Sequence, residues 1–301
     1  MPSESHSGAS DIQASLAADV GLRGDNLDWN IAGNVNGSNP NILSELTWKN
    51  IESYQYRLSG RVDIGRWIRI RSAIAYATIY SGKNQDSDYD GDNRTDEFSR
   101  SNNNSDHGRL WDANIGFGPR FDFGLDYFRL IPMAGYSYHV QHLTMTDGYQ
   151  TIDTVGEPDL GPFAGLDSSY ESRWQGPFLG INMEINAQQP LWVFEAVTLN
   201  LYLEHHWANY NAKADWNLRT DYQHPVSFRH SADGTGLIYG LGAAFYFNPK
   251  LALSMALDAS RWETDEGTDR VFLTSGAVGY TRLNRVRWDS KTFSLGMTYH
   301  F

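Results

Sequence analysis

One acidic segment of the chain has the residue types and the spacing of a calcium-binding loop. Residues 86–97 read Asp-Ser-Asp-Tyr-Asp-Gly-Asp-Asn-Arg-Thr-Asp-Glu, which satisfies the twelve-residue pattern D-x-D-x-D-G-x5-E. Ca²⁺ is a hard cation that takes about six to eight oxygen ligands, and this pattern supplies carboxylates and a backbone carbonyl in a defined order. Arg94 departs from the pattern, since a water-mediated or acidic ligand is usual at its position. The alternative is a solvated acidic surface loop. The sequence predicts a Ca²⁺ site with five ligand residues: Asp86, Asp88, Asp90, Asp92 and Glu97.

The composition limits the kind of protein that can carry this segment. The 301 residues include 24 Lys and Arg against 36 Asp and Glu, and the net charge of -12 argues against a nucleic-acid partner. Cys is absent, which excludes disulfides, thiolate metal sites and Cys nucleophiles. No apolar run reaches the roughly 18 residues that a membrane-spanning helix needs. Aromatic residues nevertheless make up 14% of a chain whose mean hydropathy is -0.50. This combination is typical of transmembrane β-barrels, whose strands alternate lipid-facing and lumen-facing residues.

Alternation with a period of two marks the expected strands. At the end of the chain, Phe293, Leu295, Met297, Tyr299 and Phe301 alternate with small or polar residues. Short connections alternate with long polar ones near residues 83–107, 147–169, 213–233 and 264–283. The predicted fold class is therefore all-β, a transmembrane antiparallel β-barrel of about ten strands with short periplasmic turns and long extracellular loops. A soluble β-sandwich is the alternative. The expected strands lie near residues 27–32, 54–64, 68–80, 111–121, 130–140, 177–185, 197–207, 237–247, 251–258 and 292–301.

The beginning of the chain shows no export signal. Residues 1–18 have neither the basic region nor the apolar region of a signal peptide. Since a barrel of this kind must cross the inner membrane, we expect that a leader has been removed. We expect a flexible tail over residues 1–22 and one barrel domain over residues 23–301.

Charged residues fall on the strand faces opposite the apolar ones. About ten tilted strands enclose a narrow lumen, and opposite charges inside it must pair to offset their desolvation. We therefore expect an ionic plug rather than a wide channel. Trp174, Trp192, Trp207 and Trp288 lie near strand ends and are predicted to be anchors at the lipid interface. The residues assigned to the plug are Arg57, Arg61, Asp63, Arg69, Arg71, Asp112, Asn182, Glu184, Asn200, Glu204 and Asp258.

Short segments across residues 26–301 resemble the omptins, ten-stranded outer-membrane barrels whose characterised members are surface endopeptidases. The resemblance lies in residues 44–49 (Ser-Glu-Leu-Thr-Trp-Lys), 133–136 (Met-Ala-Gly-Tyr) and 170–181, which occur in the omptin order. It implies an Asp–Asp couple that faces an Asp–His couple across the barrel mouth and activates a water between them.

The residues that match the two omptin couples differ in how well they fit. Asp86 and Asp88 correspond to the Asp–Asp couple. The nearest match to the Asp–His couple is Asp221 with His224, which are three residues apart instead of two and so fall on opposite faces of a regular strand. Arg219 occupies a position where the resemblance implies an acidic residue.

The resemblance also implies a lipopolysaccharide site on the outer wall. Arg173 matches one residue of that site and Tyr136 another. Tyr138 and Val140 stand where further charged residues are expected, so the predicted lipid site consists of Arg173 and Tyr136.

Three functions from different classes remain open. The leading hypothesis is an integral outer-membrane barrel of a Gram-negative cell with loops facing the exterior, which acts as a structural or surface-binding protein without proteolysis. Ca²⁺ bound to Asp86 and Asp88 would leave little of the charge that activates a water. The alternatives are an omptin-type endopeptidase of altered specificity that uses Asp86, Asp88, Asp221 and His224, and a narrow pore for small solutes. The expected partners are outer-membrane lipid, including lipopolysaccharide, and an extracellular protein or peptide, but not nucleic acid.

Overall fold

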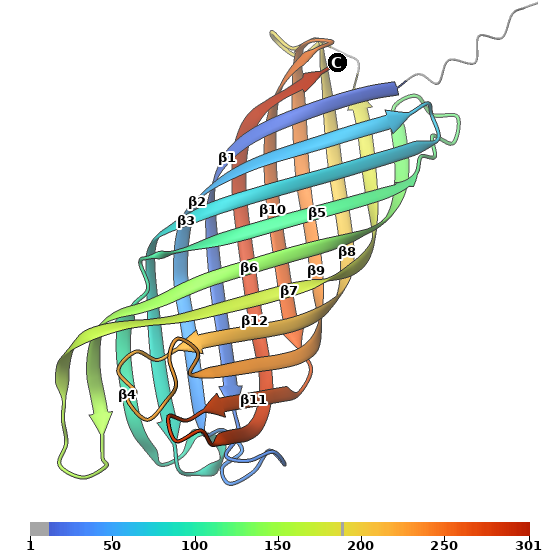
Figure 1. The fold of residues 1–301 in the computed structure, drawn as a ribbon. Helices are drawn as coiled ribbons and strands as arrows, with labels where there is room; N and C mark the ends of the chain where they lie inside the picture. Colours follow the sequence, from blue (N-terminus) through green and yellow to red (C-terminus); the bar gives the residue numbers. More distant parts are fainter. Residues whose placement is uncertain (1–11, 188–189) are drawn as a thin grey trace, which may run out of the picture.

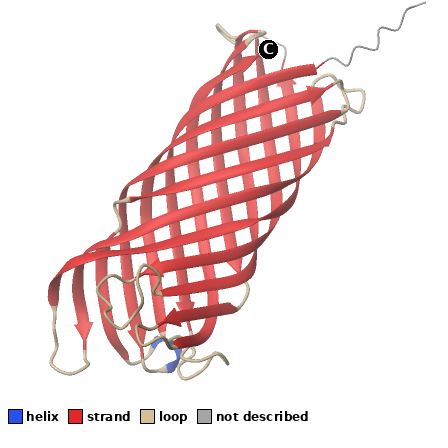
Figure 2. Cartoon of the chain, in the orientation of Figure 1, coloured by secondary structure: helices blue, strands red, loops and turns tan. Residues whose placement is uncertain are grey.

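Antiparallel strands wound into one closed barrel form nearly all of the computed structural model, which describes residues 12–187 and 190–301 (Figures 1 and 2). Both β4 and β5 lie between β3 and β6, and both β10 and β11 lie between β9 and β12. The twelve strands thus fill ten positions, as predicted, and pairing of β1 with β12 closes the ring. A single 3-10 turn, η1 (Asp92–Arg94), is the only helical element of these residues, and no helix among them is long and apolar enough to cross a membrane. The strands are β1 (Ile12–Ile31), β2 (Ser44–Ile64), β3 (Ile68–Tyr89), β4 (Glu97–Asn104), β5 (Gly108–Pro119), β6 (Phe128–Asp153), β7 (Gly161–Ala187), β8 (Ala196–Asp215), β9 (Phe228–Asn248), β10 (Leu251–Thr264), β11 (Gly267–Phe272) and β12 (Val278–His300).

The two ends of the barrel differ in their connections. The chain ends at the same end as the links between β2 and β3 and between β9 and β10, which we call the turn end (top of Figure 1). We call the opposite end the loop end. The predicted long loops there consist largely of strand, because β3 continues to Tyr89, β6 to Asp153 and β8 to Asp215. Those predictions were wrong in extent, because the strands continue beyond the region where apolar side chains face outward.

The first strand begins earlier than predicted. β1 starts at Ile12 and pairs with β2 and β12, so residues 12–22 belong to the barrel and not to a tail over residues 1–22. Small residues such as Ala17 and Gly21 on the inner face and Ala18 on the outer face weaken the alternation of Leu16, Val20 and Leu22 in the sequence. Residues 1–11 of the predicted tail lie outside the described residues.

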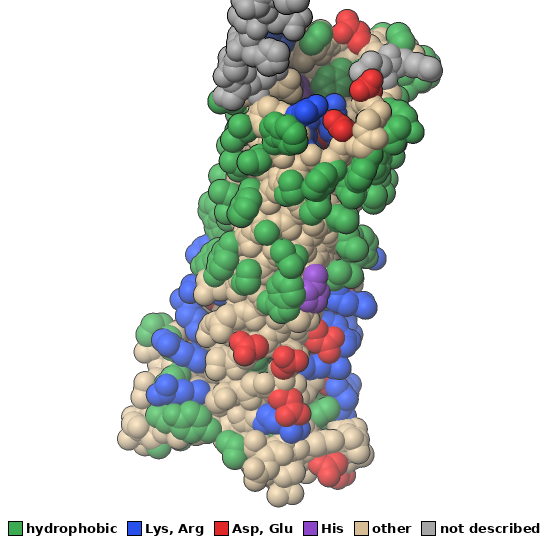
Figure 3. All heavy atoms as spheres, turned by 90° about the vertical axis from the view of Figure 1, so that its right-hand side faces the viewer, with side chains coloured by type: hydrophobic (Ala, Val, Ile, Leu, Met, Phe, Trp, Pro, Cys, Tyr) green, Lys and Arg blue, Asp and Glu red, His purple; other side chains and the backbone are tan. Residues whose placement is uncertain are grey.

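Apolar side chains change faces along each strand. Near the turn end, Leu201 and Leu203 of β8 are exposed on the outer wall, whereas Tyr210 of the same strand is buried inside the barrel. Figure 3 shows the result on one face, with hydrophobic side chains over the half near the turn end and charged side chains over the other half. This is the distribution expected of a barrel that contacts lipid in the half near the turn end and stands in water in the half toward the loop end. We call the outward-facing apolar surface the apolar band; it includes Leu199, Leu201, Leu203, Leu237, Tyr239, Leu241, Leu257, Phe293 and Leu295.

An aromatic core fills the barrel in the half toward the loop end. Its rings pack closely, with Trp262 and Trp288 stacked at a centroid distance of 5.7 Å. Trp174 and Trp288 were predicted to be lipid anchors, but both are buried in this core, and that prediction was wrong because the alternation places them on the inner face. Trp207 and Trp192 are exposed on the outside, at 46% and 94%. The largest members of the core are Trp29, Trp48, Tyr170, Trp174, Tyr210, Phe228, Trp262 and Trp288.

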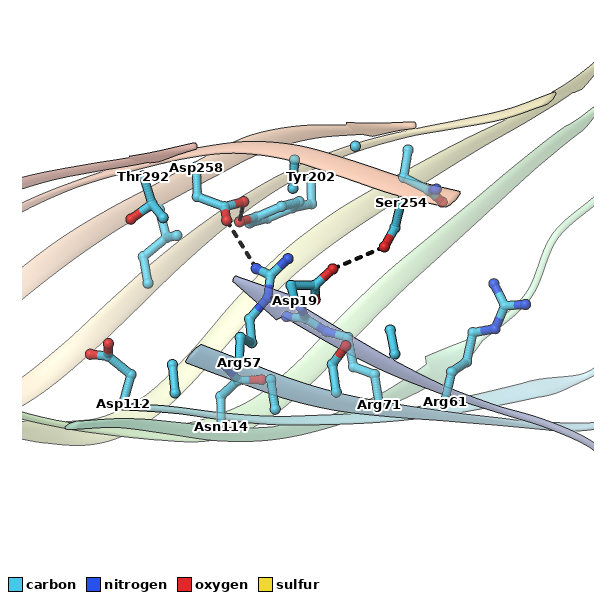
Figure 4. Close-up of a pocket in the computed structure, with 18 of the residues that line it drawn as sticks. Asp19, Arg57, Arg61, Arg71, Asp112, Asn114, Tyr202, Ser254, Asp258 and Thr292 are labelled. Carbon is cyan, nitrogen blue, oxygen red and sulfur yellow. Dashed lines mark hydrogen bonds and ion pairs between the residues drawn. The ribbon is translucent and has the colours of Figure 1, made fainter. Parts of the chain in front are cut away.

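Ion pairs occupy the barrel in the half toward the turn end, which confirms the predicted plug. Arg69 donates to Asp63 at 2.7 Å and to Glu184 at 2.7 Å. Arg57 bridges Asp258 at 2.9 Å and Asp19 at 3.3 Å. A cavity of about 380 Å³ remains between these groups (Figure 4). The aromatic core lies between this cavity and the loop end. The cavity is therefore a recess rather than a continuous channel through the described residues.

Candidate functional site at the loop end

Two carboxylates line the mouth of the barrel at the loop end. Asp86 and Asp88 of β3 are the register partners of Leu46 and Ser44 on β2, and the side chain of Leu46 is buried in the core. The two aspartates therefore share the inner face, beyond the apolar band. Burial raises the pKa of Asp86 well above its ordinary value, and the charge of Asp88 raises it further. Burial also raises the pKa of Asp88, and the nearby Ser44 hydroxyl opposes this rise.

Arg219 is the cation whose charge acts on both carboxylates. It lies in the segment between β8 and β9, and its positive charge lowers the pKa of both Asp86 and Asp88. Its guanidinium carbon lies 4.1 Å from the ring centroid of Tyr222, and it donates two hydrogen bonds to Asp221 at 2.8 and 2.9 Å. A guanidinium stays protonated at neutral pH and has no acceptor atom, so Arg219 can bind an anion or hold a carboxylate but cannot accept a proton from water.

The predicted Asp221–His224 couple is not formed. His224 Nδ1 lies 2.5 Å from Asp215 Oδ1, and the side chain of Asp221 binds Arg219 instead. Asp215 lies two residues after the exposed Lys213 and so on the same, outer face of β8. The His224–Asp215 pair therefore lies on the outer rim. Contact with Asp215 raises the pKa of His224, and contact with Arg219 lowers that of Asp221. The two residues do not pair because each has a partner of opposite charge elsewhere, nine residues away for His224 and two for Asp221.

The five predicted calcium ligands are spread over the end of the β3–β4 hairpin. Asp92 accepts a hydrogen bond from the backbone N–H of Asn41 at 2.7 Å, and Glu97 accepts one from Arg100 at 2.7 Å. Asp90 is exposed, whereas Asp86 and Asp88 point into the mouth. In residues 12–187 and 190–301, no three Asp, Glu or His side chains are close enough together to hold a metal ion. The pattern is thus present in a hairpin that does not bring its carboxylates together, and Ca²⁺ binding stays a prediction.

The predicted lipid site lies on the outer wall. Tyr136 is 48% exposed there, and the Arg173 guanidinium lies 5.7 Å from the ring centroid of Tyr138. Glu171 lies 3.6 Å from Arg173 and 3.3 Å from Lys213, so one carboxylate neutralises part of this basic surface. An anionic lipid at Arg173 would therefore have to compete with Glu171.

A family model assigns the chain to a protein family. The model of the Protochlamydia outer membrane protein family matches residues 17–301. The chain belongs to this family. No curated protein matches the chain. This member of the Protochlamydia outer membrane protein family is thus a protein of the bacterial outer membrane.

Solved structures agree with the barrel assignment. The outer membrane protease OmpT of Escherichia coli matches with a TM-score of 0.77 and 15% identity, over 99% of each chain. The translocator domain of the autotransporter NalP from Neisseria meningitidis matches with a TM-score of 0.38 and 12% identity, over 98% of this chain and 90% of that one. OprG of Pseudomonas aeruginosa matches with a TM-score of 0.35 and 11% identity, over 98% of both. The fold assignment rests on the match to OmpT, which at 15% identity shows the fold alone, an omptin-like outer-membrane barrel.

The sequence pointed to some residues of the mouth and missed others. Asp86, Asp88 and Arg219 were visible from the resemblance, and in the structure the charge of Arg219 acts on both carboxylates. Asp215 and Trp216 were not predicted, because they lie in a segment without any motif. Only the fold places Asp215 beside His224 and Trp216 beside Asp86.

Proposed function

We propose that this protein is a surface-binding barrel that does not cleave peptides and whose loop end faces the cell exterior. One observation carries the proposal: Asp86 and Asp88 at the mouth lie within reach of the charge of Arg219, whereas His224 is paired with Asp215 on the outer rim. Hydrolysis by a carboxylate and histidine pair needs the imidazole within reach of the water that it deprotonates. The arrangement found here instead favours binding of charged groups of an extracellular protein or peptide at the mouth.

The contents of the lumen argue against the pore. Trp174, Trp262 and Trp288 are each no more than 1% exposed, and they close the barrel between the ionic half and the loop end. A solute would have to displace a close-packed aromatic core. We therefore favour binding at the mouth over conduction, and planar-bilayer recordings are expected to show no conductance steps.

Refolded protein incubated with lipopolysaccharide and a mixed peptide library tests the proposal. No cleavage is expected from the wild type or from the Asp86→Ala and His224→Ala variants. OmpT refolded in the same way serves as the positive control. Cleavage by the wild type that disappears in either variant would overturn the proposal.

A second candidate is hydrolysis by Asp86 and Asp88 alone. It is favoured by the raised pKa of both carboxyls, because a pair that shares a proton can supply an acid and a base together. This activity would survive His224→Ala, would be lost in Asp88→Asn and would require a pH at which the pair holds one proton. The same peptide library distinguishes it from the first mechanism.

Calcium and lipid are proposed ligands that the same preparation can test. Ca²⁺ binding would require Asp90 and Glu97 to join Asp86 and Asp88, so Ca²⁺ is expected to raise the melting temperature only if the hairpin end rearranges. Unchanged melting in CaCl₂ and in EGTA would reject the calcium proposal, and Glu97→Gln is the matched variant. For lipopolysaccharide, Arg173→Gln is expected to weaken retention during purification, and equal retention would reject that site.

A further inference from the structure

Two neighbouring arginines on the outer wall have no carboxylate partner. Arg229 of β9 and Arg270 of β11 are register partners, and both are exposed. Neither has an Asp or Glu oxygen within 4.0 Å in the described part of the chain. Among the other arginines outside the barrel toward the loop end, Arg109 has none either, whereas Arg100, Arg173, Arg282, Arg285 and Arg287 each have one. Like charges directly opposite each other in an antiparallel pair are destabilising. Two adjacent cations without a carboxylate partner are unexpected in a chain with a net charge of -12.

Aromatic rings hold the two guanidinium groups against the wall. The Arg270 guanidinium carbon lies 4.8 Å from the ring centroid of Phe272 and 5.8 Å from that of Tyr280. That of Arg229 lies 6.0 Å from the same Phe272 ring. Cation–π contacts of this kind orient a guanidinium and leave its N–H groups free to donate.

A third cation extends the pair across another strand. Lys213 of β8 is the register partner of Arg229, and its ammonium lies 3.3 Å from Glu171. We call Lys213, Arg229 and Arg270 the cationic row. Adjacent strands are about 4.8 Å apart, so the row presents three positive groups over roughly 10 Å. A single small anion cannot contact all three, whereas a ligand with several anionic groups can.

The row lies too far from the apolar band to contact lipid headgroups. Leu237, 41% exposed, is the apolar residue of the band on β9 that is nearest to Arg229, eight residues away. Eight residues of strand span about 26 Å, and a tilt of about 35–45° leaves roughly 20 Å along the barrel axis. The headgroup layer of a bilayer is only about 5–8 Å thick on each side. Headgroups of ordinary phospholipids therefore do not reach the row, and we take its ligand to come from solution.

The geometry points to the cationic row as a binding site for a soluble molecule that carries several phosphate groups. Guanidinium groups bind phosphate oxygens through paired charge-assisted hydrogen bonds, and such a ligand would neutralise the repulsion between Arg229 and Arg270. The site is separate from the mouth and does not depend on the function proposed for Asp86 and Asp88.

Calorimetric titration of the full chain in zwitterionic nanodiscs with sodium tripolyphosphate tests the site. The wild type is expected to show saturable binding that weakens as salt is added. Arg229→Gln and Arg270→Gln should each lower the affinity about tenfold. Arg261→Gln is the matched control, because Arg261 is also exposed on the outer wall but is held by Asp289 at 2.8 Å, and its affinity should equal that of the wild type.

Three further readouts can overturn the assignment. An absence of saturable binding by the wild type, or an equal loss in Arg261→Gln, would reject it. The variant that carries both Arg229→Gln and Arg270→Gln should be at least as stable as the wild type without ligand, and a clear loss of stability would show a structural role instead. In nanodiscs of mixed lipid, this variant should retain as much anionic lipid as the wild type. A selective loss of anionic lipid would identify a headgroup site and overturn the proposal.

Discussion

The two halves of this barrel place apolar side chains on opposite faces of the same strands. Near the turn end, Leu201 of β8 faces outward while the ion pairs of Arg57 and Arg69 lie inside. Toward the loop end, Tyr210 of the same strand faces inward while the exposed Lys213 faces outward. The first half is polar inside and apolar outside because lipid surrounds it, and the second has a dry core because water surrounds it. The comparison shows that the medium outside the wall decides which strand face is apolar.

The largest expected effect is on the aromatic core. Trp262→Ala should lower the free energy of unfolding by about 3–5 kcal/mol, because it leaves a large cavity beside Trp174 and Trp288. Urea unfolding of the refolded barrel, followed by tryptophan fluorescence, measures this loss. Trp207→Ala is the control on the outer face, and an equal loss there would mean that the aromatic core is not the main source of stability in this half.

A charge placed on the outer wall distinguishes the two halves directly. Leu201→Lys should lower the free energy of unfolding by about 2–4 kcal/mol, since it puts a cation in the apolar band. Asn209→Lys, on the same face of the same strand but beyond the band and opposite Gln175 and Asp233, should change it by less than about 0.5 kcal/mol. The comparison of the halves fails if the two substitutions cost the same in lipid vesicles.

The stability of the ionic half should depend on the balance of its buried charges. Glu184 lies within 3.5 Å of Arg61, Arg69 and Arg129. Glu184→Gln removes the shared negative charge but keeps a hydrogen-bonding group, and we expect a loss of about 2–3 kcal/mol. The same urea titration checks it. Asp289→Asn, which breaks an exposed pair with Arg261, should cost less than about 1 kcal/mol.

The smallest expected effect is a pH-dependent one at the mouth. Because the pKa of Asp86 is raised in the folded state, its charge opposes folding above that pKa, and the penalty disappears as the pH falls toward the ordinary carboxyl range. Asp86→Asn should therefore raise the melting temperature at pH 7.5 and have little effect near pH 3.5. Asp221, whose pKa is lowered by Arg219, should behave in the opposite sense, so Asp221→Asn should slightly lower the melting temperature at pH 7.5. Melting curves at the two pH values decide between these outcomes.

Three features could be predicted from the sequence: the barrel class, the ten strand positions around the ring and the paired charges inside the half near the turn end. Each follows from a local pattern, because side chains alternate between two faces every second residue. The same reasoning misplaced residues 12–22, where small residues weaken the alternation, and the long loops, where the strands continue beyond the apolar band. Trp174 and Trp288 were assigned to lipid because they lie near the ends of expected strands, and a period of two does not show which face points inward.

The sequence by itself determined that this is an outer-membrane barrel with an acidic pair at positions 86 and 88. Only the tertiary structure decided what those carboxylates face. The charge of Arg219 acts on them and His224 lies beside Asp215, because the fold of the segment between β8 and β9 sets these positions. The cationic row likewise joins residues 213, 229 and 270, which become neighbours only when β8, β9 and β11 pair. Contacts between distant strands depend on the closure of the whole ring, which no local pattern encodes.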